Sequence, residues 1–166
     1  WAIELVDFLL PFVYLDYLGI RPRTLSALFG IAAAPFLHGN FYHLAANTVP
    51  FAVLSFIVIL TSQHEYVSLF VFSALSAGTG TWLFGERSSV HIGISGVIFG
   101  LFGFVLARGF FTRNILYIIV SVAAAIMYGG ILFSIFPTRG FISWECHLFG
   151  FLGGIAFARI SANRIT

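Results

Sequence analysis

The sequence predicts an all-α membrane protein, a single domain over residues 1–166 built as a bundle of six transmembrane helices. Apolar residues make up 60% of the chain and charged residues only 8%, whereas soluble domains average about 45–50% and about 25%. Long stretches carry no charge at all and are continuously apolar rather than alternating. Lipid admits only helices and closed barrels, and barrels need alternation, so these stretches predict helices.

Five segments satisfy the requirement of about 20 mostly apolar residues for a membrane-spanning helix, or come close to it. Short connections between several of them favour antiparallel neighbours. The predicted segments, in chain order, are residues 41–60, 66–85, 88–107, 114–138 and 145–160.

The first 40 residues are less regular. Residues 1–18 carry Glu4, Asp7, Pro11 and Asp16, which are costly inside a bilayer. We expect this first segment to be the exit half of a truncated helix whose start precedes Trp1. Residues 21–40 are free of acidic residues but are broken by proline and glycine, and we expect them to form a long interfacial loop.

Polar side chains lie at the starts of three predicted helices. His43 and Asn47 open the second segment, Ser95 lies near the start of the fourth, and His147 opens the sixth. Two spans separate each group from the next, so all three groups emerge on one side of the membrane. If the fourth helix begins near Arg87, Ser95 lies about 10 Å below the interface at 1.5 Å per residue. The three groups can therefore converge at a water-filled cavity.

Glycines recur on two of these helices. Gly96 and Gly100 share a face of the fourth segment, and His147, Gly150 and Gly154 share a face of the sixth, at spacings i, i+3 and i+7. Such glycines let membrane helices approach closely. We therefore expect the fourth and sixth segments to pack tightly, with the serine and histidine meeting at one end of the contact.

Three motifs together resemble the rhomboid family of intramembrane serine proteases. They are Gly-Ile-Ser-Gly at 93–96, His-Leu-Phe-Gly at 147–150 followed by Gly154, and His-Leu-Ala-Ala-Asn at 43–47. Their order and spacing cover most of the chain. The stretch at 19–23 (Gly-Ile-Arg-Pro-Arg) is similar to that of many prokaryotic members, which implies a multi-pass protein of a prokaryotic plasma membrane.

The resemblance implies hydrolysis by a serine–histidine dyad. Ser95 is then the nucleophile and His147 the general base, because a serine hydroxyl needs an adjacent base to take its proton. The resemblance also implies that the Ser95 backbone N–H and the side chains of His43 and Asn47 form the oxyanion hole, and the i, i+4 spacing of the last two fits that role. No metal or cofactor is required, and Glu145, two residues from His147, is expected to point to another face.

Other residues are assigned places around the dyad. Gly93, Gly96, Gly150 and Gly154 are expected to allow close helix packing near the site. Phe99 stands where better-known members often carry a tyrosine that packs on the catalytic histidine; phenylalanine can stack but offers no hydroxyl. We expect the cavity to be wet, with three further polar residues at its mouth: His38, Asn40 and His91.

The expected partners are the lipid bilayer and single-pass membrane proteins as substrates, cleaved at peptide bonds in or near their transmembrane segments. A net charge of +2 is too small to indicate nucleic acid binding. Two rival interpretations stay open. One is a non-catalytic, rhomboid-like pseudoprotease that binds membrane-protein clients, and the other is a transporter, which would need a polar path to both faces. The sequence sets neither the orientation nor the oligomeric state.

Overall fold

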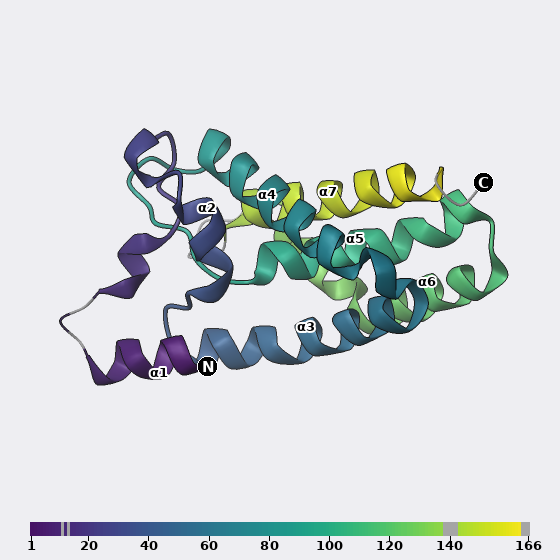
Figure 1. Ribbon diagram of the computed structural model, residues 1–166, viewed down its shortest axis with the longest axis horizontal. Coiled ribbons are helices and arrows are strands. Elements are labelled where there is room, and N and C mark those ends of the chain that lie inside the picture. Colours follow the sequence, from purple (N-terminus) through teal and green to yellow (C-terminus); the bar gives the residue numbers. More distant parts are fainter. Residues whose placement is uncertain (11, 13, 138–142, 164–166) are drawn as a thin grey trace.

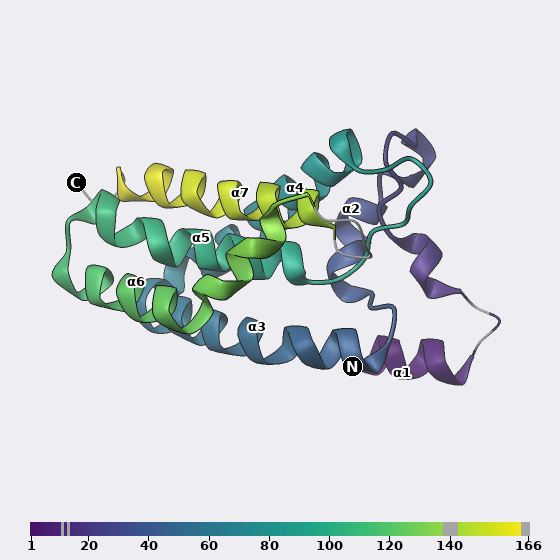
Figure 2. The same cartoon turned by 180° about the vertical axis from the view of Figure 1, so that it is seen from behind.

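The computed structural model describes residues 1–10, 12, 14–137 and 143–163. In these residues every regular element is a helix, apart from one isolated backbone bridge between Ile20 and His91. Figures 1 and 2 show an elongated bundle in which the long helices run side by side along its main axis. The predicted all-helical fold is confirmed.

The first long hairpin consists of α3 (Phe41–Ser62) and α4 (Tyr66–Phe84), joined by the short 3₁₀ turn η4 (Gln63–Glu65). Asn40 is the N-cap of α3, and its side-chain oxygen accepts a hydrogen bond from the backbone N–H of His43 at 2.8 Å. Such a cap satisfies one of the donors that a helix start leaves unpaired. The cap thereby fixes where the first turn of α3, which carries His43, begins.

Helix α5 (Ser95–Thr112) lies at the centre of the bundle and is buried along most of its length. It ends at Arg113, whose left-handed backbone (φ 52°) stops the helix. Asn114 then caps α6 (Ile115–Tyr128), which continues as the 3₁₀ segment η5 (Gly129–Ile135). Figure 2 shows η5 leading back from α6 toward the start of α7 (Trp144–Ala162).

The most extensive packing in the molecule is between α5 and α7. Glycines make it possible, because a Cβ at Gly150 would overlap the carbonyl of Gly96 and a Cβ at Gly154 would overlap the carbonyl of Gly100. A Cβ at Gly96 would in turn stand 2.6 Å from the sulfur of Cys146. The expectation of tight glycine-mediated packing between these two helices is confirmed.

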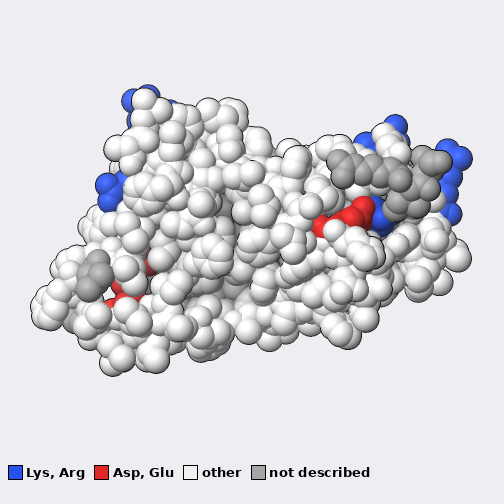
Figure 3. All heavy atoms as spheres, viewed as in Figure 1, with Lys and Arg blue, Asp and Glu red and all other residues white. Residues whose placement is uncertain are grey.

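Three helical stretches of the described residues are long and apolar enough to cross a membrane: Phe41–Phe84, which contains both α3 and α4, Ser95–Thr112, and Ile115–Ile135. On the face shown in Figure 3, charged atoms gather toward the two ends of the long axis and leave an uncharged stretch between them. This is the distribution of a membrane protein. Helix α7, with Glu145 and Arg159, is not among the three stretches, so a count of six crossing helices stays a prediction.

Two predicted segments differ from the structure. The fourth begins at Ser95 instead of residue 88, because the backbone of His91 pairs with that of Ile20 and Gly93 has a positive φ of 116°. The helical path assumed from Arg87 to Ser95 is therefore wrong. The fifth segment matches α6 with η5 as far as Ile135, and its predicted end at Thr138 lies outside the described residues.

The first segment, predicted over residues 1–18, is not one helix. It contains α1 (Ala2–Leu9), about 12 Å long at 1.5 Å per residue, and the 3₁₀ turn η1 (Leu15–Leu18). The two elements are linked by the Asp7 carboxylate of α1, which accepts a hydrogen bond from the backbone N–H of Leu15 at 3.0 Å. Pro11, which also figured in the prediction, lies outside the described residues.

The loop that was predicted to be interfacial, residues 21–40, contains η2 (Leu25–Ala27), α2 (Gly30–Ala33) and η3 (Ala34–Phe36). Arg23 fastens its start to the end of α4: its guanidinium donates to the carbonyls of Leu83 at 2.7 Å and Gly85 at 2.6 Å. A cation at a helix C-terminus also interacts favourably with the helix dipole. At the other end of the loop, the carbonyl of Ala34 accepts from the N–H of Gly93 at 2.9 Å. The loop thus holds the segment that leads into α5.

Candidate functional site

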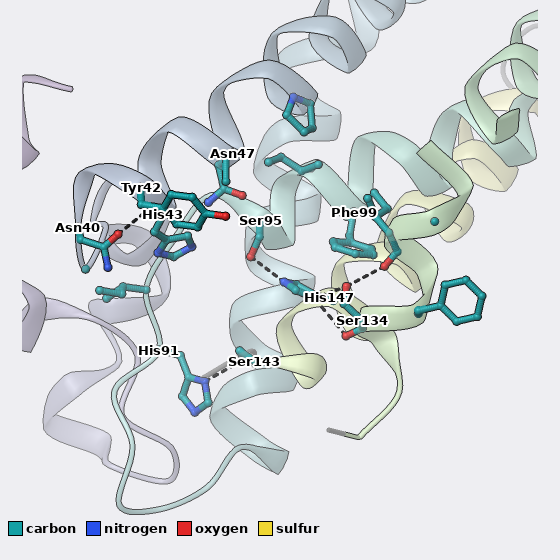
Figure 4. Close-up of a pocket in the computed structure, with 18 of the residues that line it drawn as sticks. Asn40, Tyr42, His43, Asn47, His91, Ser95, Phe99, Ser134, Ser143 and His147 are labelled. Atoms are coloured by element: carbon teal, nitrogen blue, oxygen red, sulfur yellow. Dashed lines mark hydrogen bonds between the residues drawn. The ribbon is translucent and has the colours of Figure 1, made fainter. Parts of the chain in front are cut away.

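A cavity of about 810 Å³ lies at the end of the bundle where α3, α5 and α7 begin. Four predicted site residues line it: His43 and Asn47 from α3, Ser95 from α5 and His147 from α7. Figure 4 shows these side chains facing a common space. The expectation that the three polar groups converge on one side of the bundle is confirmed by this arrangement.

Ser95 and His147 are in hydrogen-bond contact. Ser95 is the first residue of α5, and its Oγ lies 2.9 Å from Nε2 of His147 (Figure 4). His147 lies in the first turn of α7 and is buried, with 9% of its surface exposed. A hydroxyl and an imidazole at this distance can exchange a proton directly, which is the geometry that a nucleophile and its base require.

The imidazole of His147 is held from two further sides. The ring of Phe99, one turn after Ser95 on α5, stacks on it with centroids 4.3 Å apart and an interplanar angle of 13°. Nδ1 of His147 lies 3.0 Å from Oγ of Ser134, in η5, and 3.2 Å from the carbonyl oxygen of the same residue. The ring therefore has one orientation, with Nε2 toward Ser95. Glu145 is also buried, but the structure shows no hydrogen bond between it and His147.

On the other side of Ser95 are the two residues predicted for the oxyanion hole. A Cβ built on Gly93 would stand 3.0 Å from Nε2 of His43 and 3.8 Å from Nδ2 of Asn47, so both nitrogens lie directly beside this backbone. Nδ2 of Asn47 is buried without a hydrogen-bond partner in the described part of the chain. An unpaired buried donor at the edge of a cavity is costly unless something binds to it.

Gly93 has a different place from the one predicted. It precedes α5 instead of lying on it, at a bend of the chain with φ of 116°. This conformation is strained for residues with a Cβ, and a Cβ would also press on the His43 ring, whose Cε1 would be 2.9 Å away. Gly93 therefore lets the backbone pass beneath His43 and turn into α5.

The mouth of the cavity contains two of the three residues expected there, Asn40 and His91. His91 bridges two elements: Nδ1 lies 2.8 Å from Oγ of Ser143, just before α7, and Nε2 lies 2.6 Å from Oγ of Ser89. Burial lowers the pKa of His91, and the nearby Glu145 and Glu86 carboxylates oppose that shift.

His38 lies elsewhere than predicted. It is buried beside a smaller neighbouring cavity of about 350 Å³, against the His43 ring, with centroids 5.2 Å apart. The residues at this second cavity include Asn47, which lines both. His38 therefore supports His43 from behind instead of lining the mouth of the main cavity.

Two serines of the cavity, Ser134 and Ser143, were missed by the sequence analysis. Ser134 lies within the charge-free stretch of residues 114–138, and the argument that singled out Ser95, a polar group in a predicted span, applies to it as well. Ser143 lies between the predicted spans, where serine is common and gives no signal.

Comparisons with known proteins place the chain among rhomboid-domain proteins. A family model of the rhomboid domain matches residues 25–164. The chain is 38% identical to uncharacterized protein Rv1337 of Mycobacterium tuberculosis, over 95% of this chain and 69% of that protein. It is 36% identical to uncharacterized protein ML1171 of Mycobacterium leprae, over 95% and 65%. A Bacillus subtilis protein provisionally named rhomboid protease YdcA is 28% identical, over 77% of this chain and 64% of its own length.

Proposed function

Because the chain belongs to the rhomboid family, we propose that it is an intramembrane serine endopeptidase that cuts peptide bonds in or near the transmembrane segments of other membrane proteins. The observation that carries the proposal is the 2.9 Å contact between Oγ of Ser95 and Nε2 of His147, at the wall of a cavity large enough for an extended peptide segment. The family name of the Bacillus subtilis relative points the same way.

In the proposed reaction, Oγ of Ser95 attacks the carbonyl carbon of the scissile bond while its proton passes to Nε2 of His147. The imidazolium then gives this proton to the leaving amine, and an acyl-enzyme ester on Ser95 remains. Water then enters the cavity, loses a proton to His147 and attacks the ester carbonyl, and His147 returns this proton to Oγ of Ser95 as the carboxylic acid product leaves. The dyad is regenerated without any cofactor.

The developing oxyanion needs hydrogen-bond donors, and losing one donor typically costs about 10²–10³ in rate. We assign this role to the backbone N–H of Ser95, to His43 and to Asn47. Ser95 is at the N-terminus of α5, where the helix dipole favours negative charge. Nδ2 of Asn47, which has no hydrogen-bond partner among the described residues, and the ring of His43 face the same cavity.

The substrates are proposed to be single-pass membrane proteins. A transmembrane helix hides its carbonyls in internal hydrogen bonds, so a cleaved segment must unwind locally. Small residues or proline near the cut ease the unwinding, since glycine and proline have the lowest helix propensities. The cavity can hold an unwound segment, because its wall offers polar groups to the freed backbone and apolar side chains, such as Ile98, Phe99 and Ile131, to the substrate side chains.

Labelling with a fluorophosphonate serine probe in detergent tests the proposal. We expect the native protein to react, and Ser95→Ala and His147→Ala not to react. Ser143→Ala, which removes another serine of the same cavity, is expected to react as the native protein does. Equal labelling of Ser95→Ala, or no labelling of the native protein, would favour the pseudoprotease that binds clients without cutting them.

A further inference from the structure

Ser134 contacts the edge of the His147 ring that points away from Ser95. Oγ of Ser134 lies 2.7 Å from the carbonyl oxygen of Ile131, within η5. A carbonyl can only accept, so the single hydroxyl proton of Ser134 is donated to Ile131. Oγ of Ser134 then has only lone pairs left to offer to its other neighbour, Nδ1 of His147, which lies 3.0 Å away.

Among the described residues, Nδ1 of His147 therefore faces two acceptors and no donor. The second acceptor is the carbonyl oxygen of the same residue, Ser134, at 3.2 Å. In a neutral imidazole one ring nitrogen carries the proton and the other a lone pair. With two acceptors beside it, Nδ1 must carry the proton. Nε2 then presents its lone pair to the hydroxyl of Ser95, 2.9 Å away.

The geometry points to Ser134 as the positioning residue of the dyad, which selects the base-competent tautomer of His147 and holds its ring in line with Ser95. This inference rests on the proposed function. In serine proteases with a triad, a carboxylate performs the same task for the histidine. Here a neutral hydroxyl and a backbone carbonyl from one residue replace it, and Figure 4 shows both lying against the ring.

The arrangement also joins two separate elements. Ser134 belongs to η5, which follows α6, whereas His147 belongs to α7. The link to Ile131 fixes the hydroxyl within η5, so the position of this 3₁₀ segment sets the position of the acceptor pair. Phe99 of α5 holds the flat side of the same ring. Three elements thus define one imidazole orientation.

Replacing Ser134 by alanine tests the inference by kinetics. Ser134→Ala keeps the backbone acceptor but loses the hydroxyl, which contacts a ring that becomes charged during catalysis. Such a hydrogen bond corresponds to about a 10- to 100-fold change in rate. We expect kcat on a transmembrane reporter to fall by about that factor, with KM within about twofold. Ser134→Thr, which retains the hydroxyl, should recover kcat to within about threefold of the native protein.

Ser121→Ala is the matched control. Ser121 lies on α6, and its hydroxyl also bonds backbone carbonyls, those of Val105 and Tyr117, away from His147. Its kcat should equal that of the native protein. If Ser134→Ala turns over at the native rate while Ser95→Ala is inactive, the inference about Ser134 is overturned and the protease proposal stands. If Ser95→Ala also cuts, the protease proposal itself fails.

Nitrogen NMR of the native protein with isotopically labelled histidine gives a second test that needs no variant of Ser134 to fold. The His147 signals are assigned by their loss in His147→Gln. At neutral pH we expect Nδ1 to show the shift of a protonated ring nitrogen and Nε2 that of an unprotonated one. The opposite pattern would overturn the inference, since Ser134 would then not be accepting from Nδ1.

Discussion

Phe99 lies flat against the imidazole of His147, with ring centroids 4.3 Å apart and the planes inclined by 13°. The contact joins α5 to α7 one turn below the Ser95–His147 hydrogen bond. Phe99 is almost fully buried, with 3% of its surface exposed, and a phenyl ring there has no hydroxyl to satisfy. Its contribution to the site is therefore the orientation of the histidine ring.

Phe99→Leu should lower kcat about 3- to 10-fold with little change in KM, because stacked aromatic pairs contribute about 0.5–1.5 kcal/mol beyond their burial. Phe102→Leu is the control: Phe102 is fully buried on the same helix but packs near Phe151, away from His147. It should lower thermal stability and leave kcat unchanged. Equal kcat for Phe99→Leu and the native protein would show that the stacking does not orient the base.

Gly93→Ala should abolish most activity. The new Cβ meets the His43 ring at 2.9 Å in a backbone with φ of 116°, so either the ring or the start of α5 must shift. Displacing an oxyanion donor costs about 10²–10³ in rate, and the strained backbone costs about 1–3 kcal/mol in addition. Initial rates and thermal unfolding in detergent measure the two effects.

The control for this substitution is Gly129→Ala. Gly129 has a right-handed helical backbone, and no atom of the described residues lies within 4 Å of its Cβ position. Alanine should be neutral or slightly stabilising there, because it restricts the unfolded chain. A Gly93→Ala variant as active as Gly129→Ala would remove His43 from the proposed oxyanion hole.

Arg23→Ala should reduce the free energy of unfolding by about 1–2 kcal/mol, since it removes two charge-assisted hydrogen bonds to the end of α4. Arg23→Lys should recover little of this loss, because a lysine ammonium does not reproduce the planar fork of the guanidinium. Arg87→Ala, at an exposed position on the same side of the molecule, should have no measurable effect. Equal midpoints of thermal unfolding for Arg23→Ala and Arg87→Ala would contradict this assignment.

Acid should destabilise the protein in part through His38. Burial, with a contribution from the neighbouring His43, lowers the pKa of His38 from 6.5 to about 4. The unfolded chain therefore binds a proton at a higher pH than the folded chain does. The stabilisation by neutral His38 is complete above about pH 6.5 and is lost as the pH falls through about 4.

The measurement for His38 is the difference in the thermal midpoint between about pH 7.5 and about pH 4.5. We expect His38→Gln to show a smaller drop than the native protein. His64→Gln, which replaces an exposed histidine in η4 at the far end of α3, should show the native drop. An identical drop for His38→Gln would exclude His38 as a source of the acid sensitivity.

The long helices and the meeting of Ser95 with His147 could be predicted because their signals are local. A charge-free apolar run predicts a helix, and the alternation of helix directions places the starts of α3, α5 and α7 at one end. The glycines at 96, 100, 150 and 154 predicted the α5–α7 contact, because their spacing places them on one face of each helix. Each of these inferences needs only the sequence and the length of a turn.

The path of residues 86–94 could not be predicted in this way. Residues 88–94 belong to the same charge-free run as α5, which favours a helix, but the backbone pairing of His91 with Ile20 and the bond from Gly93 to Ala34 hold residues 91–93 out of the helix. Both partners are more than 50 residues away, and no local pattern indicates them. The polar position of Ser134 in an apolar stretch was a local signal, but its contact with His147 depends on the return of η5 toward α7 and could not be predicted.

Cleavage of a single-pass reporter by the purified protein in lipid vesicles tests the proposed chemistry most directly, with the products identified by mass spectrometry. We expect the native protein to cut the reporter at one position in or beside its transmembrane segment, and Ser95→Ala and His147→Ala to leave it intact. Cleavage at the same position and rate by Ser95→Ala would contradict the proposed role of the serine, and with it the protease mechanism.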